Sequence, residues 1–262
     1  MEFRLKIVAT LIVRDEDDVI YETLDEIKKY TDNIIVLDGG SEDNTVDIVS
    51  KFRGVALHKV KSGNNWDHAG ERQILLDLAL AEGADWIITL DADEIYHTNP
   101  IDVIEQAEAE GANLVRCEVP QFFFTEKELA EGTLQTENEA LSVQQRRKWY
   151  SWGWTECVIF KAVPGVTYLP EKNNGRIRRP PGFTIDPPIE ASVRPILKHY
   201  QYRSLRQYGK KMKTRRRNCE KNHMRWFRWT YENPFKNEAN LAYFDGVFRY
   251  DGVLKYKGEH VE

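Results

Sequence analysis

Five short runs of almost unbroken apolar residues, separated by amphipathic stretches, constrain the fold of this chain more than any other feature. Such a run suits a strand that is buried on both faces, as strands of a parallel sheet are. The stretches between the runs carry apolar residues at helical spacing and begin or end at residues typical of helix termini. The runs cover residues 5–13, 33–38, 54–60, 85–91 and 113–119. Strand alternating with helix predicts a doubly wound α/β sheet.

The carboxyl ends of these expected strands carry acidic or small polar residues. In doubly wound sheets ligands bind at this edge, because loops and helix amino termini meet there. The first run ends in the segment from Thr10 to Asp15, the second in Asp38-Gly39-Gly40-Ser41 and the fourth in Asp91-Ala92-Asp93-Glu94. We therefore expect a ligand site that these three strand ends share.

The fourth of these ends places three carboxylates within four positions, Asp91, Asp93 and Glu94. Like charges about 4 Å apart repel by roughly 4 kcal/mol at an effective dielectric constant of about 20, so a cation is expected among them. Because side chains alternate along an extended segment, Asp91 and Asp93 are expected to point to the same side and to reach one ligand or metal. The similar triplet at residues 15–17 is interpreted instead as the solvated start of a helix.

Charge is distributed unevenly along the chain. Residues 1–110 hold 25 Asp and Glu against 10 Lys and Arg, whereas residues 198–228 hold 12 Lys and Arg against one acid. No apolar run approaches the roughly 18 residues that a membrane span needs, and the amino terminus is interpreted as a core strand rather than a signal peptide. The three cysteines are far apart and fit neither a disulfide framework nor a zinc cluster, which favours a reducing cytoplasm.

Three ordered motifs carry a resemblance to a known family: IVATLIVRDEDDVIYETLDEI, IIVLDGGSEDNTVDIV and NWDHAGERQILLDLALAEGADWIITLDADE. With the later segment LKHYQYRS, they resemble the nucleotide-sugar-dependent glycosyltransferases of family 2. The resemblance covers about the first 95 residues closely and implies a GT-A (Rossmann-like) fold, with a mixed, mainly parallel sheet flanked by helices. It implies a catalytic domain over 1–200, with a nucleotide-sugar-binding half (1–118) and an acceptor half (119–200).

The resemblance implies a donor site, most readily for a UDP-sugar. Asp38 would accept a hydrogen bond from a uracil-like base, flanked by the backbone of Thr10 and Leu11. Arg14 would also lie at the nucleotide-sugar, and Arg72 would contact the base or the diphosphate. Two alternatives stay open, because Asp38 could instead cap the helix after Gly39-Gly40-Ser41, and Arg72 could be an exposed helix arginine in a salt bridge with Glu71 or Asp77.

The resemblance also implies a divalent metal, Mn²⁺ or Mg²⁺, which stabilises the charge of the leaving diphosphate. Asp91 and Ala92 would lie at the ribose and metal region, and Asp93 would bind the metal directly. His199 would be the third protein contact to the metal. Its alternative is an ordinary packing or surface histidine, since magnesium does not prefer a nitrogen ligand, although manganese accepts one.

Members of the family that invert the anomeric centre need a carboxylate base for the acceptor hydroxyl. Glu156 is favoured, because Trp152 and Trp154 precede it and aromatic faces commonly stack on sugar rings of an acceptor. The same tryptophans could equally belong to a core. Glu171 and Asp186 are the other candidates for the base, and the proline-rich segment 178–195 is expected to be a loop.

The basic segment after His199 predicts a helical carboxyl-terminal extension over 201–262. Residues 203–229 combine Lys and Arg with tryptophans. One interpretation is a solvated helix that packs against the acidic first half. The others are a peripheral contact with a membrane surface, which a lipid-linked rather than a free glycan acceptor would explain, and a contact with nucleic acid.

Other classes of protein remain as alternatives. A nucleotidyltransferase acting on sugar phosphates would need a glycine-rich basic loop after the first strand, where this chain has RDEDD. A phosphatase of the haloacid-dehalogenase type would carry its acidic pair after the first strand, whereas here three strands precede it. A non-catalytic protein that binds nucleotide or nucleic acid is also compatible with the sequence. The favoured function is a metal-dependent, inverting glycosyltransferase.

Overall fold

The computed structural model describes residues 5–60, 68–125, 128, 130–134, 136–168, 183–185, 187–210 and 248–255. The chain divides into two compact units, one of residues 1–118 and 155–197 and the other of residues 119–154 and 198–262. Strands β6 and β7 run through both units. The predicted limits at residues 200 and 201 remain a prediction.

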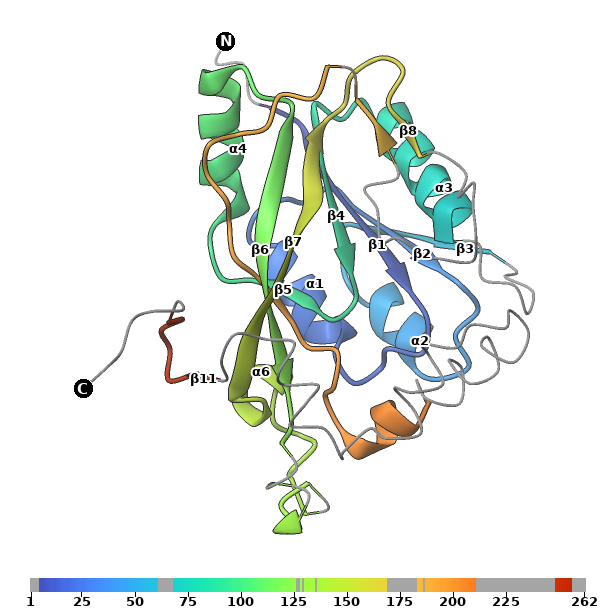
Figure 1. Cartoon of the computed structure of the whole chain (residues 1–262). Coiled ribbons are helices and arrows are strands. Elements are labelled where there is room, and N and C mark those ends of the chain that lie inside the picture. The colour runs from blue at the N-terminus through green and yellow to red at the C-terminus, as the bar shows by residue number, and fades with distance from the viewer. Residues whose placement is uncertain are drawn as a thin grey trace, which may run out of the picture. The chain divides into compact units, whose positions relative to one another are not determined.

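The first unit contains the predicted alternation of strands and helices (Figure 1). All five predicted apolar runs form strands, and the four stretches between them form helices. The elements are β1 (Ile7–Val13), α1 (Ile20–Ile27), β2 (Ile34–Asp38), α2 (Thr45–Ser50), β3 (Val55–Lys59), α3 (His68–Ala81), β4 (Trp86–Asp91), α4 (Pro100–Glu110) and β6 (Leu114–Phe123).

The sheet of the first unit is mixed, as predicted. Its strand order is β3-β2-β1-β4-β7-β6, where β7 spans Trp149–Lys161. Strands β3, β2, β1 and β4 run parallel to one another, and β7 pairs antiparallel with β4. Strand β7, and the short β5 (Glu94–Tyr96) at the opposite end of the same sheet from β3, were not predicted, because aromatic and acidic residues interrupt their apolar patterns.

Strand β1 forms the centre of the core. All seven of its residues are buried, and it has a parallel neighbour on each side. Val8 and Ile12 belong to a cluster with Leu75, Leu76 and Ala79 of α3, so this helix covers one face of the sheet. The alternate residues of β1 are buried too, which explains why its sequence is a continuous apolar run.

Helix α4 has the termini that its sequence predicts. The Asn99 side chain accepts a hydrogen bond from the backbone N–H of Ile101 at 2.9 Å, and Pro100 is the first helical residue. The helix ends at Gly111, whose φ of 70° is the left-handed conformation that glycine adopts without strain. Asn99 and Gly111 thus flank the two ends of the helix that precedes β6.

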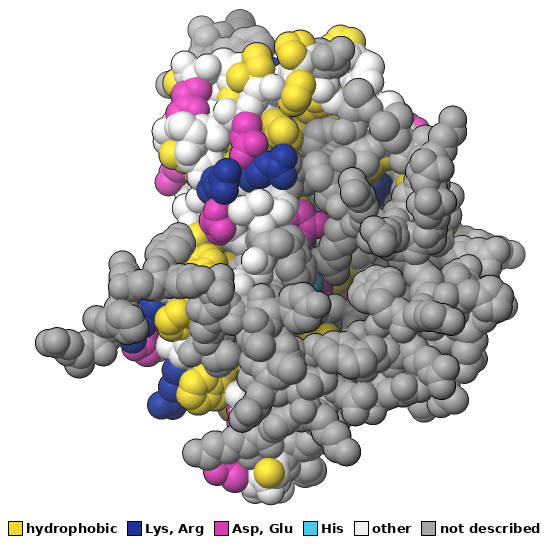
Figure 2. All heavy atoms as spheres, viewed as in Figure 1, with side chains coloured by type: hydrophobic (Ala, Val, Ile, Leu, Met, Phe, Trp, Pro, Cys, Tyr) yellow, Lys and Arg dark blue, Asp and Glu magenta, His cyan; other side chains and the backbone are white. Residues whose placement is uncertain are grey.

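Charged side chains attach the segment that leads to β10 (Leu197–His199) to strand β6. Arg116 pairs with Glu190 at 3.0 Å, and Arg194 pairs with Glu118 at 3.1 Å. Figure 2 shows acidic and basic side chains next to one another on the described part of this face. These exposed pairs contribute little free energy each, but they fix the path of a segment that has almost no regular structure.

The second unit has a core rich in aromatic residues. The ring of Phe122 lies 5.2 Å from that of Tyr150 and 4.7 Å from that of Tyr200, and Tyr150 stacks on Phe248 at 5.6 Å. Strand β10 pairs with β6, and β11 (Phe248–Arg249) pairs with β7. Helix α6 (Val143–Arg146) is capped by Ser142.

Of the described residues in the predicted carboxyl-terminal extension, 205–210 are helical, whereas another part is a strand. Strand β11 lies within 201–262, and its pairing with β7 gives its backbone the hydrogen bonds that a helix would otherwise supply. Residues 211–247, and with them most of the basic segment 203–229, lie outside the described residues. In the described part of the chain, no helix has the length and apolar character that crossing a membrane requires.

One buried side chain joins the sheet to helix α4. Trp86 of β4 is fully buried, and its indole N–H donates to Glu108 of α4 at 2.6 Å. Lys161 of β7 donates to the same carboxylate at 2.9 Å. Burial alone would raise the pKa of Glu108, but these two hydrogen bonds outweigh it and hold the pKa below its ordinary value of 4.5.

Because its folded-state pKa is lowered, Glu108 should stabilise the fold above pH 4.5, and this stabilisation should disappear as the pH falls through the folded-state value. Glu108→Gln keeps an acceptor for Trp86 but loses the charge that faces Lys161. We expect it to cost about 1 kcal/mol near neutral pH and much less in acid, measured by urea unfolding at about pH 7 and about pH 3.5. Glu105→Gln, a change at an exposed acid of the same helix, is the control. An equal cost at both pH values would contradict this role.

Candidate active site at the carboxyl edge of the parallel strands

The register of the parallel strands brings two carboxylates to the end of β1. Val13, the last residue of β1, is paired with Asp38 of β2, and Ile12 is paired with Asp91 of β4. Asp38 and Asp91 therefore lie on either side of β1, two strand spacings or about 10 Å apart. The structure thus brings together the ends of the three strands that the sequence singled out.

Asp38 holds the turn that follows β2. Its carboxylate accepts hydrogen bonds from the backbone N–H of Gly40 at 3.1 Å, from that of Ser41 at 3.2 Å and from the Ser41 hydroxyl at 2.5 Å. Only 3% of the residue is exposed. Asp38 thus caps the turn and not the helix that follows, which begins at Thr45 with Asn44 as its N-cap, so the helix-cap alternative is wrong. Contact of Asp38 with a base remains a prediction.

The loops after β1 and β2 are bonded to each other. The Ser41 hydroxyl accepts from the backbone N–H of Asp15, and Asp15 in turn accepts from that of Glu42 at 2.7 Å. Asp15 has a positive φ of 56°, a conformation that asparagine and aspartate tolerate better than most residues. The acidic triplet at 15–17 thus has a structural role in joining the two loops, and the half-buried Arg14 is the first residue after β1.

Arg72 supplies a positive charge to one member of the acidic cluster, Asp91. It reaches from α3 to Asp91, with Nη2 at 2.5 Å from Oδ1, and its Nη1 donates to the carbonyl oxygen of Leu90 at 3.4 Å. Its side chain is 7% exposed, whereas that of Asp91 is 29% exposed. The predicted alternative of an exposed helix arginine is wrong, because this buried guanidinium points to the strand end and not to solvent.

The chain turns directly after Asp91, so the expected extended alternation of Asp91 and Asp93 is wrong. Ala92 and Asp93 form a turn between β4 and β5. Thr23 of α1 donates its hydroxyl to the carbonyl oxygen of Ala92 at 2.5 Å, and Glu94 accepts from the backbone N–H of Asp91 at 2.8 Å. The sequence did not identify Thr23, since a threonine within a helix is a weak signal for a contact this distant.

Two of the predicted metal ligands lie at this turn. Asp91 and Asp93 supply oxygen atoms, which suit a hard divalent cation, and magnesium is commonly held by one or two carboxylates together with substrate phosphates. Among the described residues, no three His, Cys, Asp or Glu side chains form a group that could hold a metal ion. His199 is 1% exposed and lies in β10 of the second unit, so its contact with the metal remains a prediction.

Thr10 and Leu11 lie within β1 and not at its end. Their positions are paired with Ile35 and Val36 on one side and with Thr89 and Leu90 on the other. The predicted run 5–13 ends at the same residue as β1, but the flanking role was assigned to Thr10 and Leu11, which precede that end, because Ile12 and Val13 continue the ladder. The position beside Asp38 belongs to Val13, and the Thr10 hydroxyl instead lies 3.2 Å from that of Thr89.

The predicted acceptor residues lie along β7. Glu156 is half-buried and belongs to the first unit. Trp152 belongs to the second unit, where its indole N–H donates to the carbonyl oxygen of Lys255 at 2.5 Å and its ring meets that of Tyr150 edge-on. Trp154 is part of the same strand, and its side chain lies outside the described structure, as do Glu171 and Asp186.

The chain belongs to glycosyl transferase family 2, whose profile matches residues 10–163. The matched range contains Asp38, Arg72, Asp91, Asp93 and Glu156, whereas His199 lies beyond it. With this membership, the mixed sheet flanked by helices agrees with the GT-A fold that the sequence predicted, and glycosyl transfer is the kind of activity that the family supports.

Curated relatives match part of the chain. A TPR repeat-containing protein of Synechococcus elongatus is 36% identical over 85 residues, which is 32% of this chain and 19% of that protein. An uncharacterized glycosyltransferase of Rickettsia conorii is 30% identical over 100 residues, 38% of this chain and 33% of the relative. Glycosyltransferase SunS of Bacillus phage SPbeta is 35% identical over 91 residues, 34% and 20% of the two chains. The chain thus spans about a fifth to a third of these relatives.

Solved structures of glucosyl-3-phosphoglycerate synthase from Mycobacterium tuberculosis are similar to parts of the fold. One, in complex with Mg²⁺ and uridine diphosphate, has a TM-score of 0.35 and 22% identity and covers 44% of each chain. Another has a TM-score of 0.37 and 19% identity and covers 60% of this chain and 57% of the other. Likeness at this level carries no argument about ligands.

The pairing of Arg72 with Asp91 leads to a prediction of how a metal chelator affects the thermal unfolding of the protein in the absence of nucleotide. Chelation with EDTA should leave the thermal unfolding midpoint unchanged, because Arg72 already neutralises Asp91. Arg72→Met should lower the free energy of unfolding by about 1–3 kcal/mol, because it removes the partner of a partly buried carboxylate. Urea and thermal unfolding measure both effects, and Arg53→Met at an exposed arginine is the control. A large destabilisation of the unaltered protein by EDTA would show that a metal, and not Arg72, fills this position.

Proposed function

We propose that this glycosyltransferase transfers a sugar from a nucleoside-diphosphate donor, with a UDP-sugar favoured, to a hydroxyl of an acceptor. The observation that carries the proposal is the arrangement of Asp38 and of the Arg72–Asp91 pair on opposite sides of the end of β1. Asp38 offers a hydrogen-bond acceptor, and the Arg72–Asp91 pair offers one positive and one negative charge. A nucleotide needs this combination, because its base donates hydrogen bonds at one end and its diphosphate is anionic at the other.

At the end of the site that binds the base, the Asp38 carboxylate would accept a hydrogen bond from the N–H of uracil. A carboxylate can only accept hydrogen bonds, so it selects a base with an N–H at its pairing edge and rejects cytosine, which has an acceptor nitrogen there. The backbone of Thr10 and Leu11 is occupied by strand pairing, so in our proposal the other wall of this end comes from Arg14, the first residue after β1. Base selection thus rests on one side chain and the loop that it holds.

At the diphosphate end, Arg72 would contact the nucleotide, and Asp91 with Ala92 would lie at the ribose. Asp91 and Asp93 would hold Mn²⁺ or Mg²⁺, and His199 is proposed as a third contact. When bound, the metal supplies positive charge to the departing diphosphate. Arg72 is half of an ion pair in the ligand-free protein, so a bound cation at Asp91 and Asp93 would release its guanidinium toward the phosphates.

Glu156 is our proposed base in an inverting reaction. It would take the proton of the acceptor hydroxyl as that oxygen attacks the anomeric carbon and the bond to the diphosphate breaks. Trp152 and Trp154 are proposed to bind a glycan or lipid-linked acceptor. A cytoplasmic location and a peripheral membrane contact through residues 203–229 would agree with a lipid-linked acceptor, and both are part of the proposal.

Calorimetric titration of UDP, GDP, CDP and TDP, with and without Mn²⁺, tests the donor site. We expect UDP with Mn²⁺ to bind most tightly, and Asp93→Asn to weaken it by at least about tenfold, because a metal ligand loses its charge. Asp47→Asn on the exposed surface of α2 is the matched control. If no diphosphate binds to the unaltered protein under any condition, this edge of the sheet is not a donor site.

Glu156→Gln separates catalysis from donor binding. Removal of a general base costs about 10²–10⁴-fold in rate, so sugar transfer should fall by that factor while the affinity for UDP stays within about twofold. Transfer is measured as release of UDP from a panel of UDP-sugars with simple glycoside acceptors. A variant that keeps its transfer rate would exclude Glu156 and leave Glu171 and Asp186 as candidates.

A further inference from the structure

A single side chain of α3 fastens strand β8 (Thr167–Tyr168) to that helix. The side-chain oxygen of Gln73 accepts two hydrogen bonds from β8, one from the Thr167 hydroxyl at 2.9 Å and one from the backbone N–H of Tyr168 at 2.8 Å. Gln73 follows Arg72 directly in the helix. The sequence offered no sign of this contact, because about 95 residues separate its partners.

The orientation of the Gln73 amide is determined by Asp77. The amide nitrogen donates to the Asp77 carboxylate, one helical turn further on, at 2.8 Å. Because a carboxylate at neutral pH only accepts hydrogen bonds, the nitrogen must face Asp77 and the oxygen must face β8. The Gln73 side chain therefore has one orientation: its amide nitrogen donates within α3, and its amide oxygen accepts from β8.

Tyr168, the residue that Gln73 holds, extends from β8 to strand β4. Its ring is buried against Phe160, and its hydroxyl lies 3.4 Å from that of Thr89. Thr89 is two positions before Asp91 in β4, so the two side chains share a face of that strand. Tyr168 is thus fixed at its backbone by Gln73 and at its hydroxyl end by Thr89.

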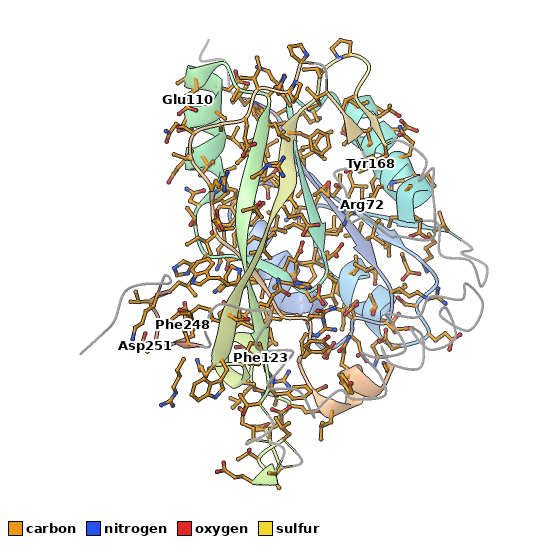
Figure 3. The ribbon with its side chains drawn as sticks, viewed as in Figure 1. Arg72, Glu110, Phe123, Tyr168, Phe248 and Asp251 are labelled. Carbon is orange, nitrogen blue, oxygen red and sulfur yellow. The ribbon has the colours of Figure 1, made fainter. Side chains whose placement is uncertain are left out.

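The phenol of Tyr168 lies within electrostatic range of the Arg72–Asp91 pair. Burial raises the pKa of Tyr168, the charge of Arg72 opposes that rise and the charge of Asp91 adds to it. Figure 3 labels Arg72 and Tyr168, which lie close together beside α3. The phenol therefore stays neutral at physiological pH.

We propose that Gln73 is a positioning residue for the nucleotide-diphosphate donor. By holding β8 on α3, it keeps Tyr168 at Thr89 of β4, two positions before the partner of Arg72, so that Arg72 meets the phosphates in one geometry. This inference rests on the proposed function, since it concerns the same donor site. Gln73 itself touches no reacting atom and acts through Tyr168 and Arg72.

The test compares Gln73→Leu with Gln73→Glu in UDP titration with Mn²⁺. Gln73→Leu has similar bulk and no acceptor, so affinity for UDP should fall about tenfold. Gln73→Glu keeps an acceptor for Thr167 and Tyr168 but places a like charge beside Asp77. It should therefore lower the thermal unfolding midpoint and yet bind UDP within about threefold of the unaltered protein. A merely structural role would make affinity follow stability in both variants.

Gln106→Leu is the matched control, because Gln106 makes the same helical bond to Glu110 at 2.9 Å and is exposed on α4. It should leave UDP affinity unchanged. If Gln73→Leu does not fold, Thr167→Val removes one of the two bonds and should weaken UDP by about threefold. Unchanged affinity in Gln73→Leu, or in Thr167→Val where that variant is used, overturns the inference and leaves the donor site intact. Absence of UDP binding in the unaltered protein instead overturns the donor site and this inference together.

Discussion

The double-sided pairing of β1 is the constraint on which the rest of the site depends. A strand with parallel neighbours on both sides and no exposed residue cannot slip by one position without turning every side chain to the opposite face. Its register therefore fixes where β2 and β4 end. Asp38 and Asp91 come to the same edge because β1 aligns them, although 53 positions separate them in the chain. A site assembled this way is positioned by the core and not by the loops around it.

Electrostatics explains why the ends of β2 and β4 differ in chemistry. Asp38 is surrounded by backbone N–H groups and a hydroxyl, which satisfy a carboxylate without a counter-charge. Asp91 instead has Arg72, whose buried guanidinium needs an anion as much as the carboxylate needs a cation. Burying either charge of that pair without the other would cost free energy. The pair can be rearranged by a ligand only if the ligand supplies both charges, which a metal-bound diphosphate does.

Much of the fold could be predicted from the sequence, and the reasons are local. Continuous apolar runs identified five strands, helical spacing identified four helices, and Asn99-Pro100 marked a helix start correctly. The sequence identified the strand ends that form the site, but not the hydrogen bonds and the ion pair that are made there. Asp91 and Asp93 were assigned to one extended segment, whereas a turn separates their environments. The partners Thr23, Gln73 and Tyr168 were missed because each acts across many residues through one or two hydrogen bonds, which leave no periodic pattern. Strand β7 was missed because its tryptophans and glycine interrupt the alternation that would reveal it.

The hydrogen bonds of Asp38 couple base recognition to loop structure. A carboxylate has about four lone-pair positions, and the turn after β2 directs three donors at them. A base N–H that bonds to Asp38 must therefore share the carboxylate with the Ser41 hydroxyl or backbone. The Ser41 hydroxyl also accepts the N–H of Asp15, so a shift at this hydroxyl reaches the loop after β1 and with it Arg14. In our proposal, two loops that Ser41 connects thus recognise the base of the nucleotide. Replacement of Ser41 would therefore change the preference for one base over another more than it changes the affinity for the phosphates.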